Sequence, residues 1–163
     1  MERQIALDKL TFISGGQTGI DRAVLDFSLD HHIRCGGWCP EGRKAEDGTI
    51  DLRYPVQELP GASYAERTLA NVNKADATVI IFSKEPAGGT RTSHEYVIKT
   101  GKPFLLLDMD KLTAAQAASE LNQFILRENP AMINFSGPRQ SEWDQGYNCC
   151  ISLLQAWYDH HQN

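Results

Sequence analysis

Short apolar runs alternate with helical patterns along this chain. Five of these runs predict strands, at residues 10–14, 33–35, 78–82, 104–107 and 132–135. The run at 78–82, Thr-Val-Ile-Ile-Phe, is continuous and rich in β-branched residues. Such a run is typical of a parallel strand that is buried on both faces.

The intervals between these runs carry apolar residues at helical spacing. A helix is expected from Ile20 to about Asp30, because Ile20, Val24 and Phe27 share one face. The capping boxes Ser63-x-x-Glu66 and Thr113-x-x-Gln116 open two more helices. Two further helices are expected at about residues 92–100 and from about residue 147 onward.

Strands that alternate with helices predict an α/β fold, with a mostly parallel sheet of about five strands between two helical layers. The length of 163 residues is close to one domain, so residues 1–163 are predicted to form a single domain. Residues 36–62 show no clear helical or strand period in the spacing of their hydrophobic residues. A structureless segment of this length inside a compact domain predicts a functional loop.

Composition and charge narrow the classes of function. Hydrophobic residues are 41% and charged residues 23% of the chain, which is typical of a globular protein. The formal net charge of −5 provides no general attraction for nucleic acid, and no apolar run approaches the roughly 18–20 residues of a membrane span. With no signal-peptide pattern after Met1, we expect a cytoplasmic protein with reduced cysteines. No metal site is predicted, since Cys35-x3-Cys39 lacks a second ligand pair.

Two glycine-containing turns each follow a predicted strand and precede a helix. The first is Gly15-Gly16-Gln17-Thr18-Gly19 and the second is Gly88-Gly89-Thr90. Because ligands in such folds bind beyond the carboxyl ends of the strands, we expect both turns to share one crevice. Free amides at a helix start favour a phosphate or a similar oxyanion. For the first segment the alternative is a tight strand-to-helix turn that binds nothing, and this segment lacks the dinucleotide spacing G-x-G-x-x-G.

Polar and aromatic residues near these turns are further candidates. Asp21 is expected to stabilise the helix dipole, or to contact a ligand hydroxyl or N–H group. Trp38 offers a flat face for a heterocycle, although it also fits a buried anchor in a charged loop. The residues Arg53, Tyr54, Arg67, Asn71 and Arg139 are expected to face the same crevice. The candidate ligand-binding residues are Gly15, Gly16, Gln17, Thr18, Gly19, Asp21, Arg22, Trp38, Arg43, Gly88, Gly89, Thr90, Arg91 and Thr92.

Several of these segments resemble the molybdenum carrier family of bacteria, which is related to the algal molybdenum-cofactor carrier. The similar segments are Ser14-Gly15-Gly16-Gln17-Thr18-Gly19-Ile20-Asp21-Arg22-Ala23, residues 37–48, and Gly88 to Thr92. The resemblance implies a Rossmann-like fold and a homo-oligomer, a dimer or a tetramer. It also implies a carrier without a catalytic metal, whose ligand is a phosphorylated pterin, the molybdenum cofactor, or a related nucleotide.

A more distant resemblance supplies the alternative function. The lonely-guy phosphoribohydrolases, which are grouped with lysine-decarboxylase-like proteins, carry the motif Pro-Gly-Gly-x-Gly-Thr-x-x-Glu. Gly88, Gly89, Thr92 and Glu95 fit this spacing, whereas Ala87 and Arg91 depart from it. This resemblance implies cleavage of nucleoside 5′-monophosphates, with Glu95 as the acid/base group. The spacing Thr92-x-x-Glu95 also fits a capping box, which would give Glu95 a purely structural role.

Overall fold

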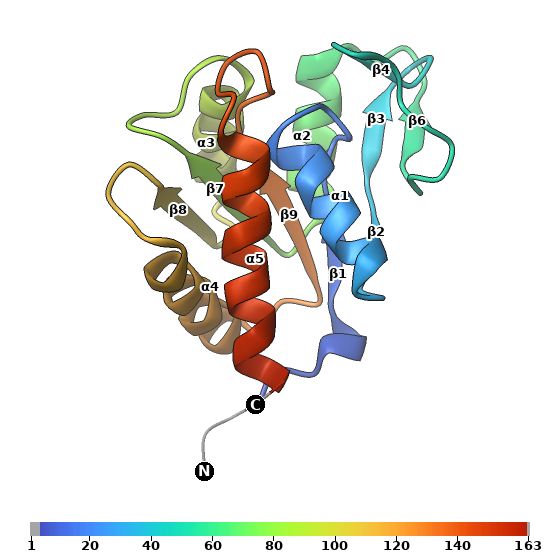
Figure 1. Cartoon of the computed structure of the whole chain (residues 1–163). Coiled ribbons are helices and arrows are strands. Elements are labelled where there is room, and N and C mark those ends of the chain that lie inside the picture. Colours follow the sequence, from blue (N-terminus) through green and yellow to red (C-terminus); the bar gives the residue numbers. More distant parts are fainter. Residues whose placement is uncertain (1–3, 163) are drawn as a thin grey trace.

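A five-stranded parallel sheet forms the middle layer of the molecule in the computed structural model, which describes residues 4–162 (Figure 1). The strand order across the sheet is β2-β1-β9-β7-β8. Along the chain these strands are β1 (Thr11–Ile13), β2 (Arg34–Gly36), β7 (Ala77–Phe82), β8 (Phe104–Asp108) and β9 (Met132–Ser136). Each strand lies within two residues of its predicted position.

Helices cover both faces of this sheet. One face carries α1 (Ile20–Asp30), α4 (Ala114–Glu128) and α5 (Gly146–Gln162), and the other carries α2 (Tyr64–Lys74) and α3 (Gly88–Thr100). All six residues of β7 are buried: Val79 and Ile81 pack into the core with α1, α4 and α5, whereas Ile80 and Phe82 pack against α2 and α3. The predicted three-layer α/β fold is therefore confirmed. Within residues 4–162, no helix has both the length and the apolar composition to cross a membrane.

The last strand in sequence lies in the middle of the sheet. β9 pairs in parallel with β1 on one side and with β7 on the other. The rings of Phe12 and Phe135 lie 4.8 Å apart between centroids in the core beneath these strands. This arrangement places the chain that follows β9 between the chain segments that follow β1 and β7.

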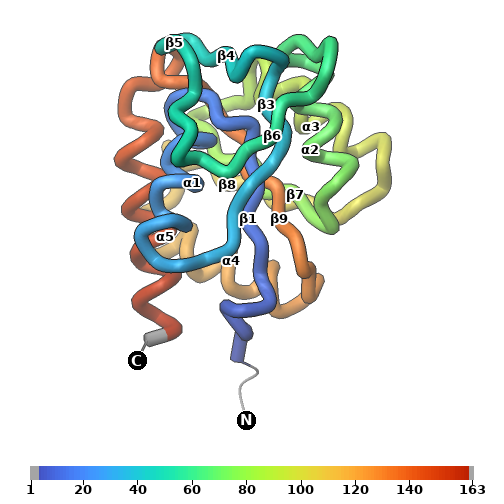
Figure 2. The backbone as a smooth tube through the Cα atoms, turned by 90° about the vertical axis from the view of Figure 1, so that its right-hand side faces the viewer, coloured from blue at the N-terminus to red at the C-terminus, as the bar shows by residue number. Residues whose placement is uncertain are grey.

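The expectation of a structureless loop at residues 36–62 is wrong. This segment contains a parallel pair, β3 (Trp38–Pro40) and β6 (Gln57–Leu59), and an antiparallel pair, β4 (Lys44–Ala45) and β5 (Gly48–Thr49). It also forms a small core with α1, made of Leu25, Cys39, Ala45, Ile50, Tyr54 and Val56. Figure 2 shows β3, β4 and β5 at the end of the molecule opposite the two chain termini. Strands of two or three residues are too short to produce a detectable hydrophobic period.

Helix α3 begins four residues earlier than predicted. Its N-cap is Ala87, which has no side-chain capping hydrogen bond, and its first residue is Gly88. The Thr92 hydroxyl donates instead to the Gly88 carbonyl oxygen at 3.4 Å, and Glu95 lies in the second turn of the helix. The capping box expected for Thr92 and Glu95 is therefore wrong, and the glycines themselves form the helix start.

Candidate functional site

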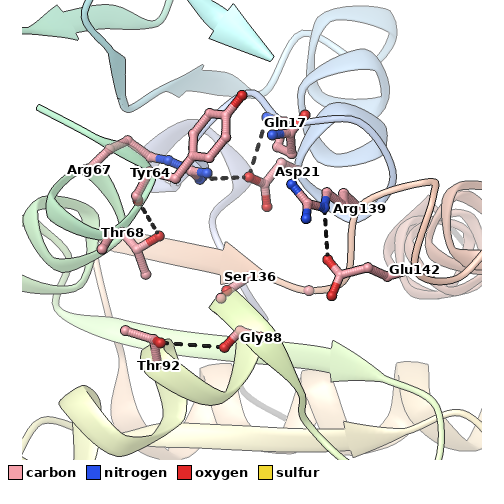
Figure 3. A pocket seen from close by; sticks show the side chains of 13 residues that line it. Gln17, Asp21, Tyr64, Arg67, Thr68, Gly88, Thr92, Ser136, Arg139 and Glu142 are labelled. Carbon is pink, nitrogen blue, oxygen red and sulfur yellow. Dashed lines mark hydrogen bonds and ion pairs between the residues drawn. The ribbon is translucent and has the colours of Figure 1, made fainter. Parts of the chain in front are cut away.

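A cavity of about 310 Å³ opens at the carboxyl edge of the sheet, between the N-terminal ends of α2 and α3 (Figure 3). The turns after β1 and β7 both reach this cavity, so the expected convergence of the two glycine-containing segments is present. Its lining residues are Gln17, Asp21, Tyr64, Ala65, Arg67, Thr68, Gly88, Gly89, Thr92, Ser136, Gly137, Arg139 and Glu142.

A buried ion pair forms one wall of the cavity. Arg67 Nη1 donates to Asp21 Oδ2 at 3.0 Å, and the two residues are only 9% and 4% exposed. A Cβ atom built on Gly15 would lie 1.7 Å from Arg67 Nη1, so only glycine leaves room for this arginine. Burial raises the pKa of the Asp21 carboxyl above its ordinary value, while Arg67 and the amides of Gln17 and Gly15 oppose that shift.

The Arg67 guanidinium keeps donors that no protein group uses. Its Nε atom is buried without an acceptor, and within residues 4–162 its only hydrogen bond is the one from Nη1 to Asp21. A buried donor without a partner is costly, because its interaction with water has been lost without replacement. An incompletely paired cation in the wall of a cavity is therefore a candidate contact for an anionic ligand.

The first glycine-containing segment does not offer its amides to the cavity. The Gln17 amide is directed at Asp21 Oδ2 at 3.4 Å, and the Thr18 amide donates to the side-chain oxygen of its neighbour Gln17 at 3.0 Å. Arg22 donates to the Gly16 carbonyl and pairs with Asp47 at 3.0 Å. The oxyanion cradle predicted for residues 15–19 is therefore not formed at the cavity, since the amides of Gln17 and Thr18 are directed at side-chain oxygens and the three glycines lie outside the lining. Of the first group of candidates, Gln17 and Asp21 line the cavity, whereas Gly15, Gly16, Thr18, Gly19 and Arg22 do not.

The second glycine-containing segment does present free donors. Gly88 and Gly89 line the cavity at the start of α3, and neither amide has a protein acceptor within the part of the chain that the structure describes. The starts of α2 and α4 differ, because Ser63 and Thr113 form the two predicted capping boxes there. Helix α1 also starts without a side-chain cap, but its first turn already holds the buried Asp21 carboxyl. The uncapped start of α3 thus provides backbone amides and a helix dipole that favour an oxyanion in this cavity.

A carboxylate of the protein already lies beside this helix start. Glu142 Oε2 is 2.9 Å from the position that a Cβ atom on Gly88 would occupy. The other carboxylate oxygen of Glu142 lies 3.2 Å from Arg139 Nε, and this arginine also lies 3.6 Å from Glu46. The segment after β9 therefore places the Glu142 carboxylate against the start of α3, and Arg139 of the same segment pairs with this carboxylate.

Two candidates from residues 36–62, Trp38 and Arg43, stabilise the fold and do not contact the cavity. Arg43 donates to the carbonyl oxygens of Ile50, Asp51, Tyr54 and Val56 at 2.7 to 3.1 Å, so four of its five N–H donors hold this segment together. The backbone amide and carbonyl of Trp38 are hydrogen-bonded to the Asn71 side chain. The Trp38 ring centroid lies 5.8 Å from Lys74 Nζ. Neither Trp38 nor Arg43 lines the cavity, contrary to expectation.

Of the remaining candidates on α3, one lines the cavity and the others do not. Thr92 lines the cavity, whereas the Thr90 side chain is buried and lies outside its lining. Arg91 and Glu95 form an exposed ion pair at 3.0 Å, on a surface of α3 that does not line the cavity. Hydrolysis with Glu95 as the acid/base group requires its carboxylate in the cavity. Glu95 lines a separate cavity of about 460 Å³ with Gly88, Arg91 and His94, and the lining of that cavity does not include Arg67 or Asp21.

Sequence reasoning identified some lining residues and missed others. Arg67 and Arg139 face the cavity as expected, whereas Arg53 and Tyr54 join Asp26 in a separate hydrogen-bonded cluster. Asn71 and Ser136 line a small polar recess next to the cavity. Tyr64 and Glu142 were missed. The position of Tyr64 at the first turn of a capped helix was a usable signal, but nothing in the sequence pointed to Glu142.

A parallel α/β sheet with helices on both faces and a polar cavity at its carboxyl edge defines a Rossmann-like fold. The model of the circularly permutated YpsA SLOG family matches residues 12–158, and the chain belongs to this family. The central position of the last strand, β9, is consistent with a permuted chain order.

A solved structure gives a close comparison. It is described as a putative molybdenum carrier protein from Syntrophus aciditrophicus SB and shares 37% sequence identity with this chain. The alignment covers 90% of this chain and 93% of that chain, with a TM-score of 0.89. The family resemblance found in the sequence is thereby confirmed. No curated protein matches the chain.

Proposed function

We propose that this protein is a carrier that binds a small phosphorylated heterocycle in the cavity between α2 and α3. The favoured ligand is the molybdenum cofactor, a phosphorylated pterin, and in this proposal the molybdenum is part of the cargo. The observation that carries the proposal is the uncapped start of α3, where Gly88 and Gly89 line the cavity and their amides have no acceptor among the described residues. The description of the solved relative as a carrier supports the class of function.

The surroundings of this helix start support a phosphate in particular. The carboxylate of Glu142, which lies 2.9 Å from where a Cβ atom on Gly88 would be, supports an oxygen anion at this position, and a ligand phosphate would replace it. Arg139 would then exchange its internal partner for the phosphate. Arg67 lies across the cavity from Gly88 and offers further donors (Figure 3). The buried Asp21 carboxyl suits a neutral N–H or hydroxyl group of the ligand, because it would repel a phosphate.

The Gly89→Asp variant is expected to bind 6-hydroxymethylpterin monophosphate at least about tenfold more weakly than the wild type. The new carboxylate lies at the second residue of α3, where it competes with the ligand phosphate for the helix start. The same carboxylate stabilises the helix through its dipole, and aspartate has a better helix propensity than glycine. The variant is thus expected to lose affinity without losing thermal stability. Isothermal titration calorimetry and thermal unfolding measure the two effects.

Two further variants control this experiment. Gly89→Ala adds a methyl group where no atom lies within 4 Å, so it should bind the probe like the wild type. Glu142→Gln removes the internal carboxylate and should bind the probe more tightly, by about three- to tenfold, since a like charge no longer competes. Equal affinities for wild type, Gly89→Asp and Glu142→Gln would show that the start of α3 does not hold the phosphate.

A further inference from the structure

Tyr64 is the aromatic side chain in the lining of the cavity. It is the first residue of α2, and its position is fixed by the adjacent capping box, in which Glu66 Oε2 accepts from the Ser63 amide at 2.6 Å. Figure 3 shows the Tyr64 ring beside Arg67, on the α2 wall of the cavity. An aromatic ring is therefore held at the cavity by a rigid helix start.

The Tyr64 ring has little packing role inside the protein. The residue is 40% exposed, which makes it one of four large hydrophobic residues of the described chain with substantial exposure. It also lines a second cavity, of about 430 Å³, formed with Pro40, Lys44 and neighbouring residues. Within residues 4–162, its hydroxyl group makes no hydrogen bond. Core packing and hydrogen bonding thus do not explain an aromatic residue at this position.

The Arg67 guanidinium lies beside the same ring. Arg67 Cζ is 5.8 Å from the Tyr64 ring centroid, within the range of a cation–π contact. Asp21 is paired with this guanidinium and provides a buried carboxyl group next to it. A flat surface, a planar cation and a hydrogen-bonding carboxyl therefore occur together on the α2 side of the cavity. This combination suits a planar heterocycle that carries N–H groups.

Gly88 and Gly89, whose amides have no acceptor among residues 4–162, line the cavity at the start of α3, and Figure 3 shows Gly88 on the wall opposite Tyr64 and Arg67. A ligand with a ring at one end and a phosphate at the other would therefore span the cavity from α2 to α3. The cavity volume of about 310 Å³ falls within the usual range for small-molecule sites.

We infer that Tyr64 is the specificity-determining residue of the cavity, and that it binds the planar ring of the ligand while α3 binds the phosphate. The inference rests on the proposed function and assigns the ring contact to Tyr64 in place of Trp38. It also names the class of ligand: a phosphate monoester of an aromatic heterocycle, in preference to a sugar phosphate.

The test measures the affinity of two probes for three proteins by isothermal titration calorimetry. The probes are 6-hydroxymethylpterin monophosphate, which has an aromatic ring, and ribose 5-phosphate, which has none. The proteins are wild type, Tyr64→Phe and Tyr64→Ala, each checked by thermal unfolding. Tyr64→Ala is expected to bind the pterin probe at least about tenfold more weakly, because stacking on an aromatic ring is lost. Its affinity for ribose 5-phosphate should equal that of the wild type, and Tyr64→Phe should bind both probes like the wild type.

Three results would overturn the inference. One is unchanged affinity of Tyr64→Ala for the pterin probe. Another is an equal loss for both probes, which would indicate that Tyr64 only maintains the shape of α2. The third is a wild-type protein that binds ribose 5-phosphate as tightly as the pterin probe, which leaves the phosphate site in place but removes ring recognition. A wild-type protein that binds neither probe would instead contradict the proposed function itself.

Discussion

Replacement of Arg67 by methionine is expected to abolish measurable binding of 6-hydroxymethylpterin monophosphate and to lower the free energy of unfolding by about 3–5 kcal/mol. The loss of binding follows from removing an incompletely paired cation from the wall of the cavity. The loss of stability follows because Asp21, only 4% exposed, would keep a buried carboxyl group without its cation. Calorimetric titration and urea unfolding give the two values.

The double variant Arg67→Met/Asp21→Asn separates these two effects. A neutral amide at position 21 needs no buried cation, and its oxygen can still accept from the Gln17 amide. The double variant should therefore recover much of the lost stability and still fail to bind the probe. Recovery of both stability and binding would mean that Arg67 acts only as the partner of Asp21.

Replacement of Gly37 by alanine is expected to lower the free energy of unfolding by about 3–6 kcal/mol, a large part of the stability of a domain this size. Gly37 has a φ of +126°, and a Cβ atom there would lie 2.1 Å from the Ser14 carbonyl oxygen. The Ser14 carbonyl belongs to the backbone, so it cannot move away from the new Cβ atom without disturbing the paired ends of β1 and β2. Urea unfolding followed by circular dichroism measures the change.

Gly48→Ala is the matched control for this substitution. Gly48 has a φ of +115°, but no atom lies within 4 Å of its added Cβ. Its cost should be limited to backbone strain, about 1–3 kcal/mol. If Gly37→Ala and Gly48→Ala destabilise the protein equally, the close approach of Gly37 to Ser14 makes no contribution of its own.

The fold was predictable where the sequence carries local signals. The apolar run of β7, the face of α1 formed by Val24 and Phe27, and the capping boxes at Ser63 and Thr113 all appear as expected. The central place of β9 was not predictable, because strand order depends on contacts between segments far apart in the chain. The strands within residues 38–59 were missed because each spans only two or three residues.

The position of the cavity was predictable, whereas the donors available in it were less so. Glycines after β1 and β7 indicated the edge of the sheet at which the cavity lies. Composition does not show whether an amide is free, however. Gln17 and Asp21 fold back onto the first segment, while Ala87 leaves the start of α3 uncapped. Arg43 likewise lies outside the cavity lining, because carbonyl groups of residues 50–56 accept hydrogen bonds from its guanidinium.

The central claim is that the start of α3, and not the first glycine-containing segment, binds the phosphate of the ligand. Amide chemical shifts from ¹H–¹⁵N spectra, recorded while the protein is titrated with 6-hydroxymethylpterin monophosphate, test it most directly. Large, saturable shifts are expected for the amides of Gly88 and Gly89, and smaller shifts for those of Gln17 and Thr18. Saturable shifts confined to residues 15–19, with Gly88 and Gly89 unchanged, would contradict it.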